Sequence, residues 1–141
     1  MIPSLRLRPF TGLYAALLML FSFSGCRDRG VLETPAPGVP LDLAQQRAER
    51  LDSLRYTLHF ELPRDKESPI PARLVVEFDL SDAAQGLALD FAGRAEQVKG
   101  IWKGEAKVEA VIADQHIVIP ARYLEAGANR LRIEFLAGDG S

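Results

Sequence analysis

Few side chains in this sequence of 141 residues could carry out chemistry. His59, His116 and Cys26 supply the only imidazole and thiol groups. A catalytic zinc ion takes three protein ligands and keeps a fourth position open. The two histidines could complete such a site with Asp90 or Glu77 if their strands met across a sheet. The alternation of apolar and polar residues around both histidines predicts instead that each points outward, so we expect no bound metal and no cofactor.

Other catalytic patterns are also missing. The sequence contains no His-Glu-x-x-His and no Gly-x-Ser-x-Gly, and the serines after residue 26 fall at the ends of elements or in turns. Gly100 and Gly104 flank Ile-Trp-Lys without a following helix, which does not suit a phosphate-binding loop. Asp79 and Asp82 could pair for acid–base work but fit a strand end and a turn better. We therefore expect no catalytic residue.

Trp102 and the overall charge bear on binding. The indole could stack on a carbohydrate, although a core or interface position suits a tryptophan better. The chain has 17 basic and 19 acidic side chains, and the resulting net charge of −2 argues against a nucleic-acid partner. A single cysteine excludes an internal disulfide.

The first 25 residues have the pattern of a secretory signal. Arg6 and Arg8 precede an apolar run over residues 12–23, and small residues follow it. As a helix, the run would span roughly 18 Å at about 1.5 Å per residue, less than the ~30 Å hydrocarbon core of a bilayer. We therefore expect residues 1–25 to be a signal peptide rather than a permanent membrane span.

The residues before Cys26 resemble a lipoprotein processing site. The run Phe23-Ser24-Gly25-Cys26 is similar to the bacterial lipobox, with phenylalanine where leucine is more usual. This resemblance implies cleavage before Cys26, lipidation of its thiol and a membrane anchor. The alternatives are a plain signal peptide with a chance cysteine, or a buried free thiol. Arg27, rather than an aspartate, favours the outer membrane facing the periplasm. Residues 26–40, rich in Pro and Gly, predict an extended tether.

An amphipathic helix is predicted for residues 41–53. Leu41, Ala44, Ala48 and Leu51 share one helical face, and Arg47 and its neighbouring charges lie on the other side. Pro40 suits the first helical position. We expect the apolar face to pack on the rest of the domain.

A period of two follows the helix and predicts strands. In residues 54–62 every even position is apolar, which indicates a half-buried strand. Further strands are expected at residues 73–80, 87–91, 98–102, 107–112, 115–119 and 130–136. The fold class is therefore all-β, with antiparallel sheets in a saddle-like or sandwich domain and one short amino-terminal helix. We expect residues 41–141 to form this domain.

The approach to the last strand contains turn signals. Pro120 and Gly127 bracket a single helical turn, with Gly127 free to adopt positive φ, and Asn129 suits the tight turn that follows. We expect the last strand to lie at a sheet edge, open to further chain.

The order of segments from residue 38 onward resembles the amino-terminal β-domain of the zinc aminopeptidases of the aminopeptidase N family, especially bacterial envelope members. The segments that carry this resemblance are residues 38–44, 47–48 and 54–60, VEFDL at 76–80, LDF at 89–91, HIVIP at 116–120, GANRL at 127–131 and residues 134–139. The resemblance implies a β-domain that caps a thermolysin-like catalytic domain.

The same resemblance implies that this chain lacks activity. In the family, the catalytic domain carries the His-Glu-x-x-His helix, a glutamate ligand and the Gly-x-Met-Glu-Asn motif, and none has a matching position here. The late acidic or amide residue that holds the substrate amine has no match either. The first hypothesis is a non-catalytic front portion of a lipid-anchored zinc aminopeptidase, whose partner would be a missing catalytic domain. The second is a stand-alone envelope lipoprotein that uses the β-domain for binding or protein interaction, with another envelope protein as a candidate partner.

Overall fold

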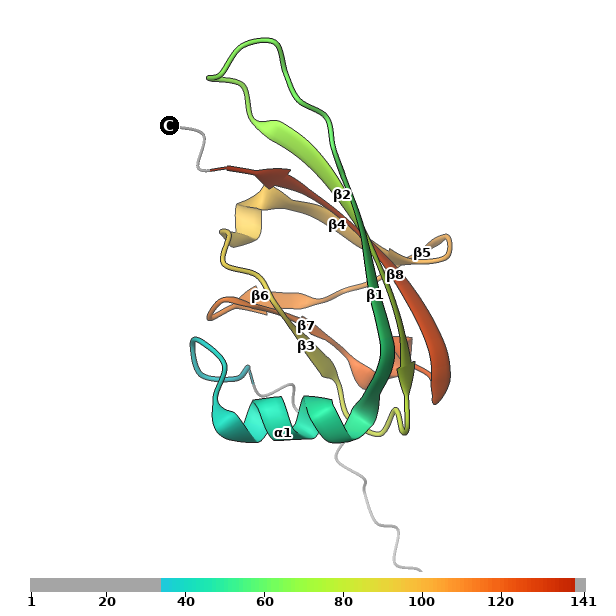
Figure 1. Cartoon of the computed structure of the whole chain (residues 1–141). Helices are drawn as coiled ribbons and strands as arrows, with labels where there is room; N and C mark the ends of the chain where they lie inside the picture. The colour runs from blue at the N-terminus through green and yellow to red at the C-terminus, as the bar shows by residue number, and fades with distance from the viewer. Residues whose placement is uncertain (1–33, 139–141) are drawn as a thin grey trace, which may run out of the picture.

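Two antiparallel sheets pack face to face in the computed structural model, which describes residues 34–138 (Figure 1). The larger sheet has the order β1-β2-β8-β4-β5 and the smaller one the order β3-β7-β6. This confirms the all-β class with one short helix. The elements are α1 (Leu41–Arg50), β1 (Leu51–Phe60), β2 (Ile70–Leu80), β3 (Leu87–Asp90), η1 (Ala95–Gln97), β4 (Val98–Lys103), β5 (Ala106–Lys107), β6 (Val111–Ala113), β7 (His116–Ile119), η2 (Ala121–Tyr123) and β8 (Gly127–Ala137).

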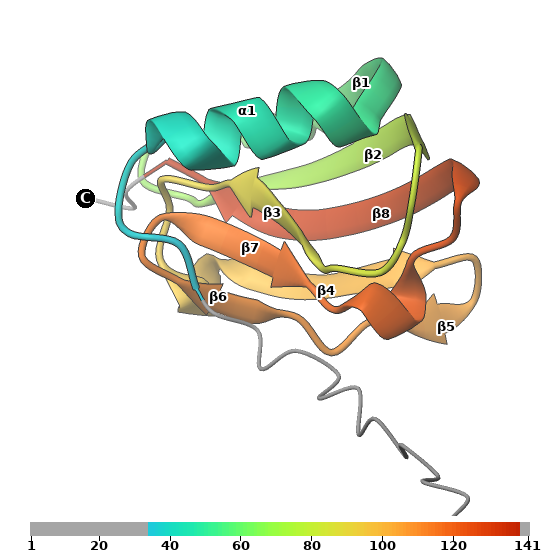
Figure 2. The same cartoon turned by 90° about the horizontal axis from the view of Figure 1, so that it is seen from below.

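The core lies between the two sheets (Figure 2). Inward side chains of β2 and β8 meet those of β3 and β7, and Phe78, Leu131, Ile133 and Ile119 are at most 2% exposed. Each such side chain contributes roughly 1.5–3 kcal/mol by leaving water, before entropy is counted. The alternation in residues 73–80 and 130–136 therefore marks the core correctly.

Strand β8 is central in its sheet rather than at an edge. It pairs with β2 along its whole length, from Gly127 opposite Leu80 to Ala137 opposite Ile70, and with β4 on its other side. The expectation of an open last strand was wrong. Alternating apolar residues predict which face of a strand is buried, but they say nothing about how many neighbours the strand has.

The strand expected over residues 107–112 is two strands in different sheets. Lys107 ends β5 in the larger sheet and Val111 begins β6 in the smaller one. Between them Val108 is buried and donates its N–H to the carbonyl oxygen of Ile101 at 2.8 Å. The apolar residues here include the point where the chain passes from one sheet to the other. The sequence pattern of such a crossing looks the same as that of one continuous strand.

The helical turn before β8 forms as the sequence predicts, but Asn129 lies within β8, opposite Phe78, and not in a tight turn. The 3-10 helix η2 follows Pro120, and Gly127 has a φ of +86°. The buried Asn129 holds this turn: its amide nitrogen donates to the carbonyl oxygens of Glu125 and Gly127 at 2.7 and 2.9 Å, and its amide oxygen accepts from the Glu125 N–H at 3.0 Å.

Helix α1 lies across one end of the sandwich, beside β3 and the start of β1 (Figures 1 and 2). It ends at Arg50, earlier than expected, and Pro40 is its N-cap rather than its first residue. The expected apolar face was wrong, because Leu41 is 73% exposed and Ala48 is also exposed. The helix instead turns Arg47 and Arg50 toward the domain.

Candidate functional site

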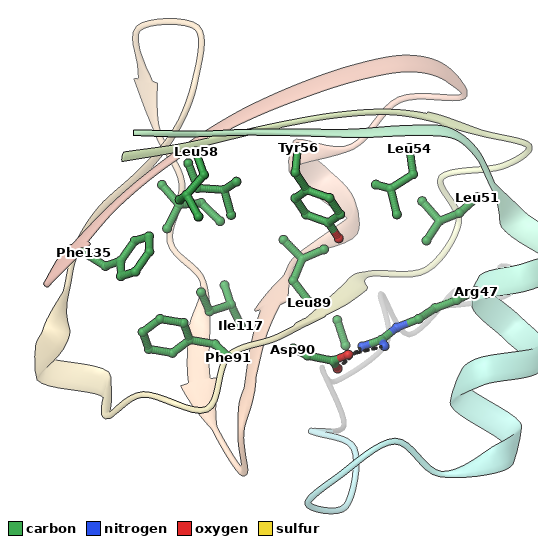
Figure 3. A pocket seen from close by; sticks show the side chains of 13 residues that line it. Arg47, Leu51, Leu54, Tyr56, Leu58, Leu89, Asp90, Phe91, Ile117 and Phe135 are labelled. Atoms are coloured by element: carbon green, nitrogen blue, oxygen red, sulfur yellow. Dashed lines mark hydrogen bonds and ion pairs between the residues drawn. The ribbon is translucent and has the colours of Figure 1, made fainter. Parts of the chain in front are cut away.

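An apolar groove of about 300 Å³ opens between β1 and the smaller sheet (Figure 3). Side chains from β1, β2 and β8 form one wall, and those of β3 and β7 form the other. The lining residues are Arg47, Leu51, Leu54, Tyr56, Leu58, Leu74, Ala88, Leu89, Asp90, Phe91, Ile117, Ile133 and Phe135. Because most of these side chains are apolar, the groove is suited to hold apolar groups.

Strand β1 leaves its apolar side chains half-open to solvent. The sequence predicted that one face of this strand is buried. That prediction was wrong, because the side chains of that face are 47%, 56%, 49% and 45% exposed at Leu54, Tyr56, Leu58 and Phe60. The larger sheet has five strands and the smaller has three, and β1 is one of the two edge strands of the larger sheet. Leu54, Tyr56 and Leu58 therefore line the groove instead of facing a packed strand. We call the four side chains of this face, Phe60 included, the β1 row.

The two ends of the groove differ in chemistry. At one end the rings of Phe91 and Phe135 meet edge to face, with centroids 5.7 Å apart. At the other end Arg47 of α1 donates two hydrogen bonds to the carboxylate of Asp90, at 3.1 and 2.8 Å (Figure 3). This bidentate pair fixes the position of the helix over the groove.

His116 lies next to Asp90, in contrast to its expected outward position. The two residues are opposite each other in the β3–β7 ladder, and the imidazole Nε2 is 3.4 Å from the Asp90 carboxylate. Neither ring nitrogen forms a hydrogen bond within the described residues, so the imidazole lies close to the carboxylate without hydrogen-bond geometry. All four residues of β7 are buried, so this strand has no solvent face and the outward position predicted from alternation was wrong.

A second arginine ties α1 to the loop before β3. The Arg50 guanidinium donates to the carbonyl oxygens of Asp82, Gln85 and Gly86 at 3.0–3.3 Å. Asp82 lies in the loop between β2 and β3, where its Oδ1 accepts a hydrogen bond from the Ala84 N–H at 3.0 Å. The carbonyl oxygens and the Asp90 carboxylate attract guanidinium groups, which is why the polar side of the helix faces the domain.

The histidines do not come together with acidic residues as metal ligands. His59 is exposed on the outer face of β1, as predicted, and lies opposite Arg73. Among residues 34–138 no three His, Cys, Asp or Glu side chains could hold a metal ion. In the same part of the chain, no helix has the length and apolar character to cross a membrane. Cys26 and residues 1–33 lie outside the described residues, so the lipidation and signal-peptide predictions stay predictions.

Trp102 is engaged by its own domain. The guanidinium of Arg132, its partner in the β4–β8 register, lies 4.7 Å from the ring centroid. The far edge of the indole also covers Gly100, where an added Cβ would come within 2.2 Å of the ring. These contacts favour a structural role over a carbohydrate platform, and they explain the glycine within β4.

None of the three comparisons, with protein-family models, curated proteins and solved structures, finds a match for the chain. The resemblance to the aminopeptidase N family therefore stays a prediction from the sequence. Sequence reasoning missed the groove and the Arg47–Asp90 pair. The groove could have been suspected only by knowing that β1 ends its sheet, and the ion pair joins residues 43 positions apart.

Proposed function

We propose that the domain over residues 41–141 is non-catalytic and works by contact with another protein surface. The observation that carries this proposal is the β1 row, whose four large apolar side chains are each 45–56% exposed. A contiguous exposed apolar surface on a water-soluble domain marks an interaction site. The charged groups near the groove are already paired, since Arg47 holds both oxygens of Asp90.

The sequence resemblance supplies a context for this contact. In that context the chain is the non-catalytic front portion of a lipid-anchored zinc aminopeptidase. The zinc ion and the removal of amino-terminal residues from peptides belong to a separate catalytic domain. Support comes from the order of the matching segments over residues 38–141.

The alternative is a stand-alone envelope lipoprotein that uses the β-domain for binding. One observation favours this alternative: β8 lies between β2 and β4. The aminopeptidase context was favoured by an open last strand and by the missing remainder of the family domain, and the central position of β8 removes the first of these two reasons.

The nucleotides downstream of the Ser141 codon discriminate between the two contexts. A continuing or frameshifted segment that encodes a His-Glu-x-x-His helix supports the aminopeptidase portion, and unrelated sequence after a terminator supports the stand-alone lipoprotein.

The non-catalytic assignment has its own test. The purified full chain is expected to release no anilide from amino-acid anilides and to hold no stoichiometric zinc, and turnover that is lost in His116→Ala would contradict it.

A further inference from the structure

The outer edge of β1 is free for strand pairing. Among the described residues β1 pairs with β2 alone. Just past the strand, Glu61 donates its N–H to the carbonyl oxygen of Pro71 at 2.9 Å, in the register that continues from His59 opposite Arg73. In an antiparallel ladder the bonded residues alternate. Odd-numbered residues therefore bond to β2, and Tyr56, Leu58 and Phe60 direct their N–H and C=O groups outward.

The sequence of this edge is chemically self-complementary about Leu58. One residue away on each side are Thr57 and His59, and two residues away are two aromatic rings. Three residues away are a cation and an anion, Arg55 and Glu61, and four residues away are two leucines. A strand with this symmetry matches a reversed copy of itself.

We infer that the outer edge of β1 binds β1 of a second copy of this chain, antiparallel and about a two-fold axis at Leu58. The inference rests on the proposed function, because it names the partner of the β1 row. In this register Arg55 lies opposite Glu61 of the second copy, and the same ion pair forms again by symmetry. The outward N–H and C=O groups of the two strands then bond to each other.

Charge supports this partner and this register. Arg55 lies opposite Glu77 in the β1–β2 ladder, but the Glu77 carboxylate is 3.4 Å from Arg130. Arg55 and Glu61 have no ion-pair partner among residues 34–138. A register centred on Thr57 would instead place Arg55 opposite His59 and leave Glu61 without an opposite charge.

The paired segment is also clear of the helix. The β1–β2 register is irregular between Asp52 and Arg55, where Ser53 has a φ of +55°. Regular pairing with β2 resumes at Arg55, so the irregularity separates the residues from Arg55 onward from the start of the strand, and α1 lies at that start (Figure 1). The side chains of the β1 row from both copies share one face of the joined sheet, so each row shields the other from water.

Sedimentation of the full chain in a density-matched detergent tests this inference. We expect a monomer–dimer equilibrium with a Kd of about 1–100 µM, because one strand pair makes a small interface. Arg55→Glu or Glu61→Arg alone should weaken the dimer about tenfold, since each creates two like-charge contacts per dimer. The double variant Arg55→Glu/Glu61→Arg should restore the Kd to within about threefold. Lys107→Glu on β5, an exposed cation in the same sheet, should leave the Kd unchanged.

A second pair of variants tests the main-chain bonds. Leu58→Pro removes an outward N–H without breaking the β1–β2 ladder, and Leu58→Ala shortens the same side chain but keeps the N–H. We expect dimerisation to be lost in the first and only weakened in the second, with thermal midpoints confirming that both fold. A chain that is monomeric at about 1 mM, or a dimer indifferent to the charge exchange, overturns the inference. The proposed function is judged separately, by anilide turnover and metal content.

Discussion

The guanidinium of Arg47 holds both carboxylate oxygens of Asp90, joining α1 to the end of β3 at 3.1 and 2.8 Å. Arg47 is mostly buried, with 18% of its side chain exposed, while Asp90 is 54% exposed. Helix α1 has no fully buried residue. Its attachment therefore depends on this pair and on Arg50 more than on apolar packing.

Removing the pair should loosen the helix. We expect Arg47→Lys to lower the free energy of unfolding by about 0.5–1 kcal/mol, because lysine keeps the charge but loses the two-pronged bond. Hydrogen exchange of the α1 amides should rise more than that of β8. Glu105→Gln, an exposed change in the β4–β5 turn, should alter neither quantity, and equal exchange in both arginine and lysine forms would contradict this role.

Two phenylalanines that look alike in sequence should differ in their contribution to stability. Phe78 is 2% exposed in the core, and Phe60 is 45% exposed in the β1 row. We expect Phe78→Ala to cost about 3–5 kcal/mol and Phe60→Ala about 1 kcal/mol or less in the monomer. Denaturant midpoints at low protein concentration measure both, and equal losses would show that β1 is packed in solution.

Gly100 is required by the indole that covers it. An added Cβ would lie 2.2 Å from the Trp102 ring, so Gly100→Ala should displace the ring from Arg132 at a cost of about 1–3 kcal/mol. Tryptophan emission should shift as the ring becomes more exposed. In the double variant Gly100→Ala/Trp102→Leu the cost of the alanine should shrink, and strictly additive losses would contradict the contact.

The pH dependence of stability should include a contribution from Glu125. The Lys103 ammonium, 2.7 Å from its Oε1, lowers the pKa of Glu125 below its ordinary 4.5, chiefly by a hydrogen bond and then by charge attraction. A carboxyl with a lowered folded-state pKa stabilises the fold above pH 4.5, and this stabilisation is lost as the pH falls through the folded-state pKa.

Glu125→Gln should therefore lower the thermal midpoint at neutral pH, and the difference from the unmodified chain should vanish by about pH 2. Glu49→Gln on α1 is the matched control, because Glu49 is exposed and has no ion pair within residues 34–138. A difference that persists unchanged at acid pH would rule out the charge as its cause.

The lipid anchor is tested at Cys26. Replacement by serine should release the protein from membranes or stop its processing, because the hydroxyl cannot receive the thioether-linked lipid. Detergent partitioning of the two forms measures this. Unchanged partitioning into the detergent phase would contradict lipidation.

The sequence alone was enough to predict the all-β class, the short helix, the strands that carry the core and the turn at Gly127. These follow from local periodicity and from backbone preferences, which neighbouring residues determine. It was also enough to place His59 on the outside of its strand. For Cys26 and the tether, the sequence still supplies the prediction.

Tertiary structure alone decided which strands are edges and which faces are covered. The same alternation occurs in β1 and β8, yet β8 lies between two strands while β1 leaves Leu58 half-exposed over a groove. His116 is buried because β7 is the central strand of its sheet. Arg47 faces inward because folding brings Asp90, 43 residues away in the sequence, within hydrogen-bond distance of its guanidinium. Burial depends on the number and position of neighbours brought together by folding, and no local pattern carries that information.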